Sequence, residues 1–334
     1  MEFSRGATFA FNGARRFLAA GYTALMKIGS GARFVMAAAM VPLMTVQPSF
    51  GWGSDGHKII NRLAAANLPH DVPVFVRDGE ALSAMAYLGL EPDRWRNQAE
   101  SELESEQAPD HFIDLERADM VGTLPRRRYD FIRDLAKVQS AHPTIPLTPE
   151  KVGMQPWQVE EIYQRLKVGF REYRELIAAN EDTKPVELAI VYYSAWLGHY
   201  VGDGSMPLHT TIQYNGWTGP NPNGYTTERH IHSKFESAFV SANVRVSDVA
   251  PLVAAVRTKV LTDEWDDYLM YLRHTHSLVE KTYQIDKAAG FDGAGTPVGK
   301  AFAEERLAAG AIELRDLIYT AWLRSADPVQ EFRG

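Results

Sequence analysis

Two pairs of a histidine and an acidic residue, each four positions apart, most constrain how this chain can fold. His199 and Asp203 lie at the end of an otherwise apolar stretch of helical pattern, and His232 and Glu236 repeat the spacing further on. Residues four apart lie on one face of an α-helix. Burying such groups is costly unless a partner satisfies them. A metal ion would satisfy both pairs, whereas a hydrogen-bonded helix pair is the alternative for either pair alone.

Further histidines and carboxylates follow in order along the chain. Candidate ligands besides the two pairs are His57, Asp93, His111 and His209. The chain contains no cysteine, so it forms no disulfides and any metal must be bound through nitrogen and oxygen atoms. Imidazole and carboxylate groups are the usual ligands of zinc in such a set. The order and spacing of the whole set favour a metal centre more than any single residue does.

The apolar periodicity predicts an all-α fold, a single mainly helical domain with long loops. Residues 157–180 show the clearest pattern, with apolar side chains every three or four positions at Val159, Ile162, Leu166, Phe170, Tyr173 and Ile177. Residues 186–201 are nearly all apolar and should form a buried helix. Helices are also expected over residues 58–67, 74–88, 228–241, 246–261, 264–287 and 300–325.

Two long loops are expected, over residues 117–149 and 213–227. Loops of this length in a compact domain are often functional. The second is rich in Gly, Asn and Pro and begins shortly after His209. Asn215 in this loop is a candidate contact for a bound nucleobase, and an ordinary turn asparagine is the alternative interpretation.

The start of the chain resembles an export signal. Arg33 precedes an apolar run over residues 34–46, and the small residues Ser49 and Gly51 follow. Cleavage after Gly51 would make residues 1–51 a leader, with a true start possible at Met26, and residues 52–334 the mature domain. The run of about 13 residues is too short for a bilayer span of roughly 20, which leaves a re-entrant or core helix as the alternative. We therefore expect an exported protein, periplasmic or secreted, without stable membrane insertion.

Several short motifs resemble one known family. They are Trp52-Gly53-x-x-Gly56-His57, Asp93-x-x-Arg96, His111-Phe112-Ile113-Asp114, His199-Tyr200-x-Gly202-Asp203-x-x-x-Pro207-Leu208-His209 and His232-x-x-x-Glu236. In this order they resemble the trinuclear-zinc, single-strand-specific nucleases of fungi, plants and bacteria (the S-one/P-one nucleases), which are related to bacterial zinc-dependent phospholipase C. The resemblance spans residues 52–236, and the chain beyond matches only as further helix.

The resemblance implies three zinc ions per chain in one cleft. One would be held by Asp93, His111, His199 and Asp203. A second would be held by the α-amino nitrogen and carbonyl oxygen of Trp52, as the mature N-terminus, together with His57 and a bridging Asp203. The third would be held by His209, His232 and Glu236.

The resemblance also implies roles for three side chains beside the zinc ions. Asp114 matches the family's catalytic carboxylate, and Arg96 matches a basic residue beside the scissile phosphate. Phe112 matches an aromatic residue that stacks on a nucleobase, although a core phenylalanine is the alternative. The chemistry is coherent, because a carboxylate can deprotonate water, arginine can bind phosphate and aromatic stacking tolerates any base.

The implied function is a secreted zinc-dependent phosphodiesterase, a hydrolase that acts as a nuclease on single-stranded DNA or RNA and on 3′-nucleotides. Glu236 departs from the family, whose nucleases usually carry aspartate there, and resembles the phospholipases. A zinc-dependent phospholipase C acting on phospholipid headgroups, or a metal-stabilised binding protein, therefore stays open as an alternative. The formal net charge of −7 is unusual for a nucleic-acid partner, but several bound dications would offset it locally.

Overall fold

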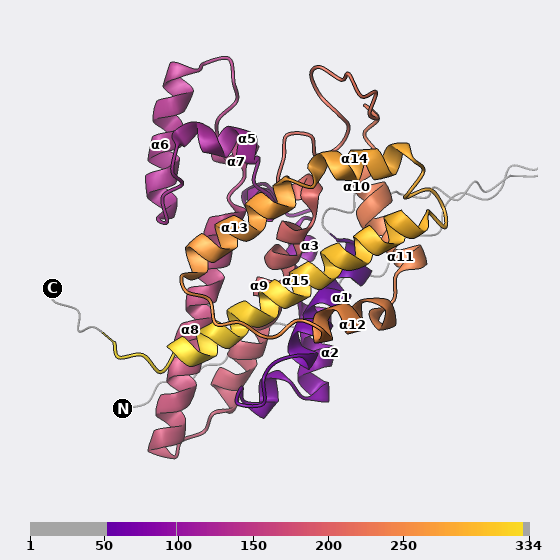
Figure 1. The fold of residues 1–334 in the computed structure, drawn as a ribbon. Coiled ribbons are helices and arrows are strands. Elements are labelled where there is room, and N and C mark those ends of the chain that lie inside the picture. Colours follow the sequence, from indigo (N-terminus) through magenta and orange to yellow (C-terminus); the bar gives the residue numbers. More distant parts are fainter. Residues whose placement is uncertain (1–51, 98, 330–334) are drawn as a thin grey trace, which may run out of the picture. The chain divides into compact units, whose positions relative to one another are not determined.

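The computed structural model describes residues 52–97 and 99–329 of the chain and confirms the all-α prediction (Figure 1). The predicted leader and the cleavage after Gly51 lie outside the described residues. Two isolated β-bridges, Ile113 with Gly153 and Tyr214 with Gly216, are the β-type pairing found in the described part. None of the helices in that part is long and apolar enough to cross a membrane.

Helices occupy most of the described chain. The α-helices are α1 (Gly53–Ala66), α2 (Gly79–Leu88), α3 (Glu91–Trp95), α4 (Ser101–Gln107), α5 (Leu115–Ala118), α6 (Arg128–Ala141), α7 (Pro149–Val152), α8 (Gln155–Ala179), α9 (Lys184–Ser205), α10 (Ile231–Ser233), α11 (Val240–Asn243), α12 (Val246–Ala254), α13 (Glu264–His276), α14 (Val279–Lys287) and α15 (Pro297–Arg324). Short 3-10 turns are η1 (Val74–Val76), η2 (Ala108–His111), η3 (Asp119–Val121) and η4 (Pro207–His209), and η5 (Lys234–Phe239) is π-helical.

Helix α9 lies at the centre of the fold. It packs against α8, α15, α2 and α1, and α15 crosses the bundle diagonally in the view of Figure 1. The predicted apolar stripe of α8 is buried as far as Phe170, whereas Ile177 near its C-terminal end is 56% exposed. The core therefore follows the helical periodicity, and α8 extends beyond it at one end.

Burial increases along α9 toward the metal-ligand candidates. Leu188 in its first turns is 74% exposed, but every residue from 197 to 211 is buried. His199 and Asp203 lie within this buried stretch, and neither side chain is exposed. Proline at position 207 has no backbone N–H and is disfavoured inside a helix, and the chain turns into η4 there, which places His209 beside the end of α9.

Two glycines let α1 approach α9 closely. A Cβ atom on Gly198 would lie 2.2 Å from Asn61 Oδ1, and one on Gly202 would lie 3.0 Å from His57 Nδ1. Both contacts are with side chains of α1. The close approach brings the His57 ring into a stack on His199, with ring centroids 4.0 Å apart. The packing of these two helices thus brings two candidate metal ligands together.

The prediction of a loop over residues 117–149 was wrong, because α6 lies within it. The helix was missed because an arginine triplet at residues 126–128 and several prolines favoured a loop over this stretch. Phe131 and Leu135 are its buried residues, and Ile132 and Val138 are partly buried against the core. Several other predicted ends also differ: residues 264–287 form two helices, and the helix from residue 246 ends at Ala254 rather than 261. The loop over residues 213–227 is confirmed as non-helical.

Replacing Gly198 with alanine should destabilise the fold by forcing α1 away from α9. Overpacking a dense interface typically costs about 1–3 kcal/mol. Gly79→Ala is the matched control, because its Cβ atom would meet nothing within 4 Å. Thermal melting with a chelator present, which removes any effect of metal loss, should show a lower midpoint for Gly198→Ala only. Equal midpoints for Gly198→Ala and the wild type would contradict the need for glycine here.

Candidate metal centre

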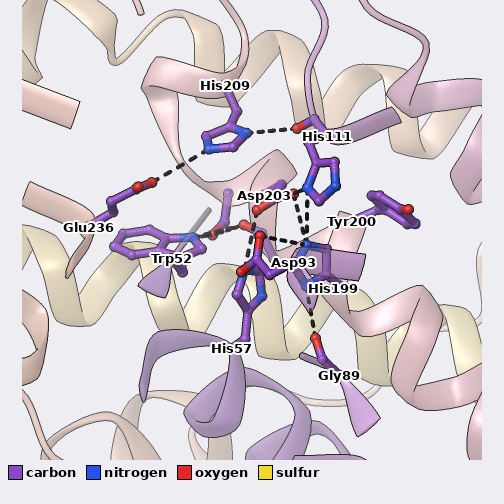
Figure 2. Close-up of polar contacts among 12 residues, drawn as sticks. Trp52, His57, Gly89, Asp93, His111, His199, Tyr200, Asp203, His209 and Glu236 are labelled. Carbon is purple, nitrogen blue, oxygen red and sulfur yellow. Dashed lines mark hydrogen bonds and ion pairs between the residues drawn. The ribbon is translucent and has the colours of Figure 1, made fainter. Parts of the chain in front are cut away.

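Three groups of histidine and acidic side chains converge in the described part of the structure, and each could hold a metal ion. Within each group the candidate ligand atoms lie within 4.8 Å of one another. The groups are His57, Asp93 and His199; His111, His199 and Asp203; and His209, His232 and Glu236. Their members come from segments far apart in the sequence, so the tertiary fold builds the centre (Figure 2).

Asp203 lies at the junction of the first two groups. Its Oδ1 is 3.3 Å from His57 Nε2, whereas its Oδ2 is 3.1 Å from His111 Nδ1 and 3.5 Å from His199 Nε2. The two oxygens of one buried carboxylate therefore face different imidazoles (Figure 2). Asp93 approaches from α3, with its Oδ1 3.8 Å from His199 Nε2. A carboxylate placed like that of Asp203 can bridge two metal ions.

The third group is compact. His209 Nε2 and His232 Nε2 are 3.1 Å apart, and Glu236 Oε2 is 3.5 Å from the first and 2.9 Å from the second. A tetrahedral zinc ion with bonds of about 2.1 Å has ligand atoms about 3.4 Å apart, which is close to this spacing. Glu236 lies in the π-helical η5, and π-helical turns are frequent at functional sites.

Backbone carbonyls orient three of the imidazoles. Each donates from Nδ1: His199 to Gly89 at 2.8 Å, His209 to His111 at 2.7 Å and His232 to Tyr214 at 2.9 Å. Because a carbonyl oxygen only accepts, these bonds place the ring proton on Nδ1. The lone pair of each Nε2 then faces its metal group, which is the arrangement that outer hydrogen bonds impose on metal-binding histidines.

Burial controls the protonation of the first two groups. It lowers the pKa values of His57, His111 and His199, and it raises those of Asp93 to about 7 and Asp203 to about 8. Both ring nitrogens of His57 and the Oδ1 of Asp203 are buried without a hydrogen-bond partner among the described residues. Neutral imidazoles and unsatisfied carboxylates are the groups that a divalent cation satisfies. The residues therefore fit metal ions.

Trp52 is anchored beside the centre by its side chain. The buried indole Nε1 donates to Gly202 O at 2.8 Å and to Ser205 Oγ at 2.7 Å. This anchor fixes the residue that precedes α1, as Figure 2 shows. The predicted role of its α-amino nitrogen depends on cleavage of the bond to residue 51, which lies outside the described residues.

A cavity of about 480 Å³ adjoins the second and third groups. Its wall includes three candidate ligands and three of the side chains predicted to act on substrate: His111, His209 and His232, with Arg96, Phe112 and Asp114. Phe112 is partly exposed in this wall rather than part of the core. The cavity therefore brings together candidate metal ligands, a carboxylate, a guanidinium group and an aromatic ring.

Backbone hydrogen bonds hold the segment that carries Phe112 and Asp114. These bonds run from Ile113 N to His209 O at 2.9 Å, from Asp114 N to Val152 O at 2.7 Å and from Gln155 N to Phe112 O at 3.2 Å. Gly153 makes the close approach possible, because it has a φ of +90° and a Cβ atom there would lie 2.0 Å from Phe112 O. The positions of both side chains are thus set by a rigid backbone.

Asp114 is a buried carboxylate outside the three ligand groups. Burial raises its pKa to about 7, and the adjacent Arg117 acts in the opposite direction. Arg117 Nη1 donates to Asp114 Oδ2 and to Lys151 O, each at 3.0 Å. Arg117 therefore orients one oxygen of Asp114. Burial also lowers the pKa of Arg96, although nearby Asp93 opposes this.

The structure does not bring Asn215 into the wall of the cavity. Its Oδ1 instead accepts a hydrogen bond from His232 N at 3.4 Å, which favours a structural role at the start of α10. The neighbouring Tyr214 does line the cavity, as do Arg117 and Lys151. Sequence reasoning missed these three residues. For Arg117 the available signal was its spacing of three from Asp114, and for Tyr214 it was its place in a predicted functional loop.

Neither a scan of the chain against protein-family models nor a search of curated proteins finds a match. The assignment of a function therefore depends on the chemistry of the centre itself.

Asp203→Asn should reduce the metal content more than Glu236→Gln does. An amide lacks the negative charge that binds a divalent cation, and the oxygens of Asp203 face two groups whereas Glu236 belongs to one. If each group binds one ion, elemental analysis of the purified variants should show about two ions lost in the first and about one in the second. Equal losses would contradict a bridging position for Asp203.

Proposed function

We propose that this protein is a zinc-dependent phosphodiesterase that hydrolyses single-stranded nucleic acid, with three zinc ions in the centre described above. One observation carries the proposal: candidate metal ligands, Asp114, Arg96 and Phe112 share one cavity. The nitrogen and oxygen ligand set, without cysteine, supports zinc. The order of motifs from residue 52 to residue 236 supports the nuclease type.

The side chains around the cavity have separate tasks in this reaction. Bound zinc would supply Lewis acidity and lower the pKa of a water molecule. Asp114 would accept the proton of the attacking water on Oδ1, because its Oδ2 is held by Arg117. A pKa of about 7 suits a general base that works near neutral pH. Arg96 would hold a non-bridging phosphate oxygen through charge-assisted hydrogen bonds.

The exposed ring of Phe112 in the cavity wall would favour unpaired bases. A base within a duplex is already stacked on its neighbours, so it cannot also stack on Phe112. A base in a single strand can do so, whatever its identity. The cavity wall carries three basic side chains, Arg96, Arg117 and Lys151, and two acidic ones, Asp114 and Glu150. The basic groups therefore outnumber the acidic ones where a phosphate would bind, although the chain as a whole is acidic.

The mature, zinc-loaded protein should hydrolyse single-stranded DNA and RNA faster than duplex DNA or phosphatidylcholine, and a chelator should abolish turnover. Asp114→Asn should keep its metal content and lose about 10²–10⁴-fold in turnover, as expected for loss of a general base. Assays on this substrate panel with elemental analysis provide the test. Turnover confined to phosphatidylcholine would assign a phospholipase instead, and full metal content without any turnover would assign a binding protein.

Phe112→Ala should impair nucleic-acid hydrolysis selectively. Loss of base stacking typically costs about 1–3 kcal/mol, whereas a small phosphodiester without a base loses nothing by the change. Comparing kcat/KM on an oligonucleotide and on such a small substrate measures the effect. Melting temperatures should stay close to the wild-type value, because the ring is partly exposed. Equal losses on both substrates with a lower melting temperature would show that the ring only packs.

A further inference from the structure

Tyr214 exposes an aromatic ring in the wall of the cavity. The side chain is 50% exposed, and its hydroxyl group makes no hydrogen bond within the described residues. Besides histidines, the wall contains two aromatic side chains, Phe112 and Tyr214. The fold does not use this ring as part of its core, so its apolar faces are available to a ligand.

The backbone that carries this ring is fixed. Tyr214 O accepts the hydrogen bond from His232 Nδ1 at 2.9 Å. On either side of it, Tyr283 OH donates to Gln213 O at 2.5 Å and accepts from Gly216 N at 3.0 Å. Gly216 itself has a φ of +101°, which favours glycine. A ring on such a rigid support loses little conformational freedom when it binds a planar group.

Phe112 and Tyr214 are each adjacent to a residue of a different metal group. Phe112 directly follows His111, which belongs to the second group, whereas the carbonyl of Tyr214 orients His232 of the third group. The ring centroids of Tyr214 and His232 lie 6.4 Å apart in an edge-to-face arrangement, so the tyrosine ring lies beside this candidate ligand. A phosphodiester bound across both groups would therefore share one cavity with both aromatic rings.

We propose, on the premise of the nuclease function above, that Tyr214 is a second stacking platform. It holds the base on one side of the scissile phosphate while Phe112 holds the base on the other side. The ligand recognised by the complete site is thus a dinucleotide unit, two bases joined by one phosphodiester, rather than a mononucleotide. The basic side chains of Arg117 and Lys151 in the same wall suit the charge of that linkage.

Binding of a dithymidine phosphorodithioate, which keeps the negative charge and resists hydrolysis, tests this platform. Two analogues, each lacking one of the two bases, complete the set of ligands. Tyr214→Ala in the metal-loaded protein should weaken binding of the two-base ligand and of one analogue by roughly 5- to 150-fold, as expected for one stacked base. Binding of the other analogue should not change.

Three further variants sharpen the comparison. Phe112→Ala should weaken binding of the analogue that Tyr214→Ala leaves unchanged, and should leave binding of the other analogue unchanged. Tyr214→Phe should bind all three ligands like the wild type, because stacking does not need the hydroxyl group. Tyr129→Ala is the matched control, since this tyrosine is 72% exposed on α6 and does not line the cavity. Elemental analysis should find the wild-type metal content in every variant.

Three results would overturn the platform. The first is unchanged binding of all three ligands by Tyr214→Ala. The second is equally weakened binding of all three ligands, which would show that Tyr214 only positions His232. The third is weakened binding of phosphocholine alone, which would indicate a cation–π site for a lipid headgroup. Turnover of the natural dinucleotide by the wild type is measured in parallel. If the base-dependent binding pattern is found without turnover, the stacking role of Tyr214 is supported and the nuclease proposal is wrong. If turnover is found without that pattern, the nuclease proposal is supported and the stacking role is wrong.

Discussion

The buried carboxylate of Asp203 is the constraint on which the rest of the structure depends. Its side chain is completely shielded from water and faces His57, His111 and His199. A charge in such a place is costly unless cations or hydrogen bonds compensate it. Glycines on α9 bring α1 close enough to supply one imidazole, and the backbone around Gly89 orients another. The fold therefore surrounds the Asp203 carboxylate with three imidazoles, and the carboxylate of Asp93 approaches the same cluster.

The sequence predicts the long helices well because their apolar periodicity is strong. The stripe on α8 and the apolar stretch of α9 are examples, and both lie where the pattern placed them. Helix α6 was missed because the arginine triplet just before it and the prolines in the same stretch favoured a loop, although Phe131, Ile132, Leu135 and Val138 recur at helical spacing. The four-residue spacing within predicted helices also identified His199, Asp203, His232 and Glu236 as candidate ligands. It could not show that they would meet, because they come from segments far apart in the chain.

Exposure is the property that a single sequence reveals least. Whether Phe112 packs in the core or lines a cavity depends on Gly153 and on residues near His209, which are distant in the chain. The same limit explains why Tyr214 was missed, since only tertiary packing shows that its ring faces the cavity. Asn215, one residue later, was noticed for its chemistry, yet it binds the backbone of His232 instead. In this loop, the chemistry of a side chain predicted its place in the cavity less well than its position in the folded chain does.

The orientation of the imidazoles bears on how readily the candidate centre could bind metal ions. Carbonyls of Gly89, His111 and Tyr214 set three ring orientations through bonds that involve no ion. In the third group the ligand atoms already lie at roughly the spacing of a tetrahedral site, so an ion would bind there with little rearrangement. An ion that binds the folded chain but not the unfolded one stabilises the fold by an amount that grows with its concentration. Because Asp203 and Glu236 lie inside the core, ions bound there and the packing of α1, α9 and η5 would stabilise one another.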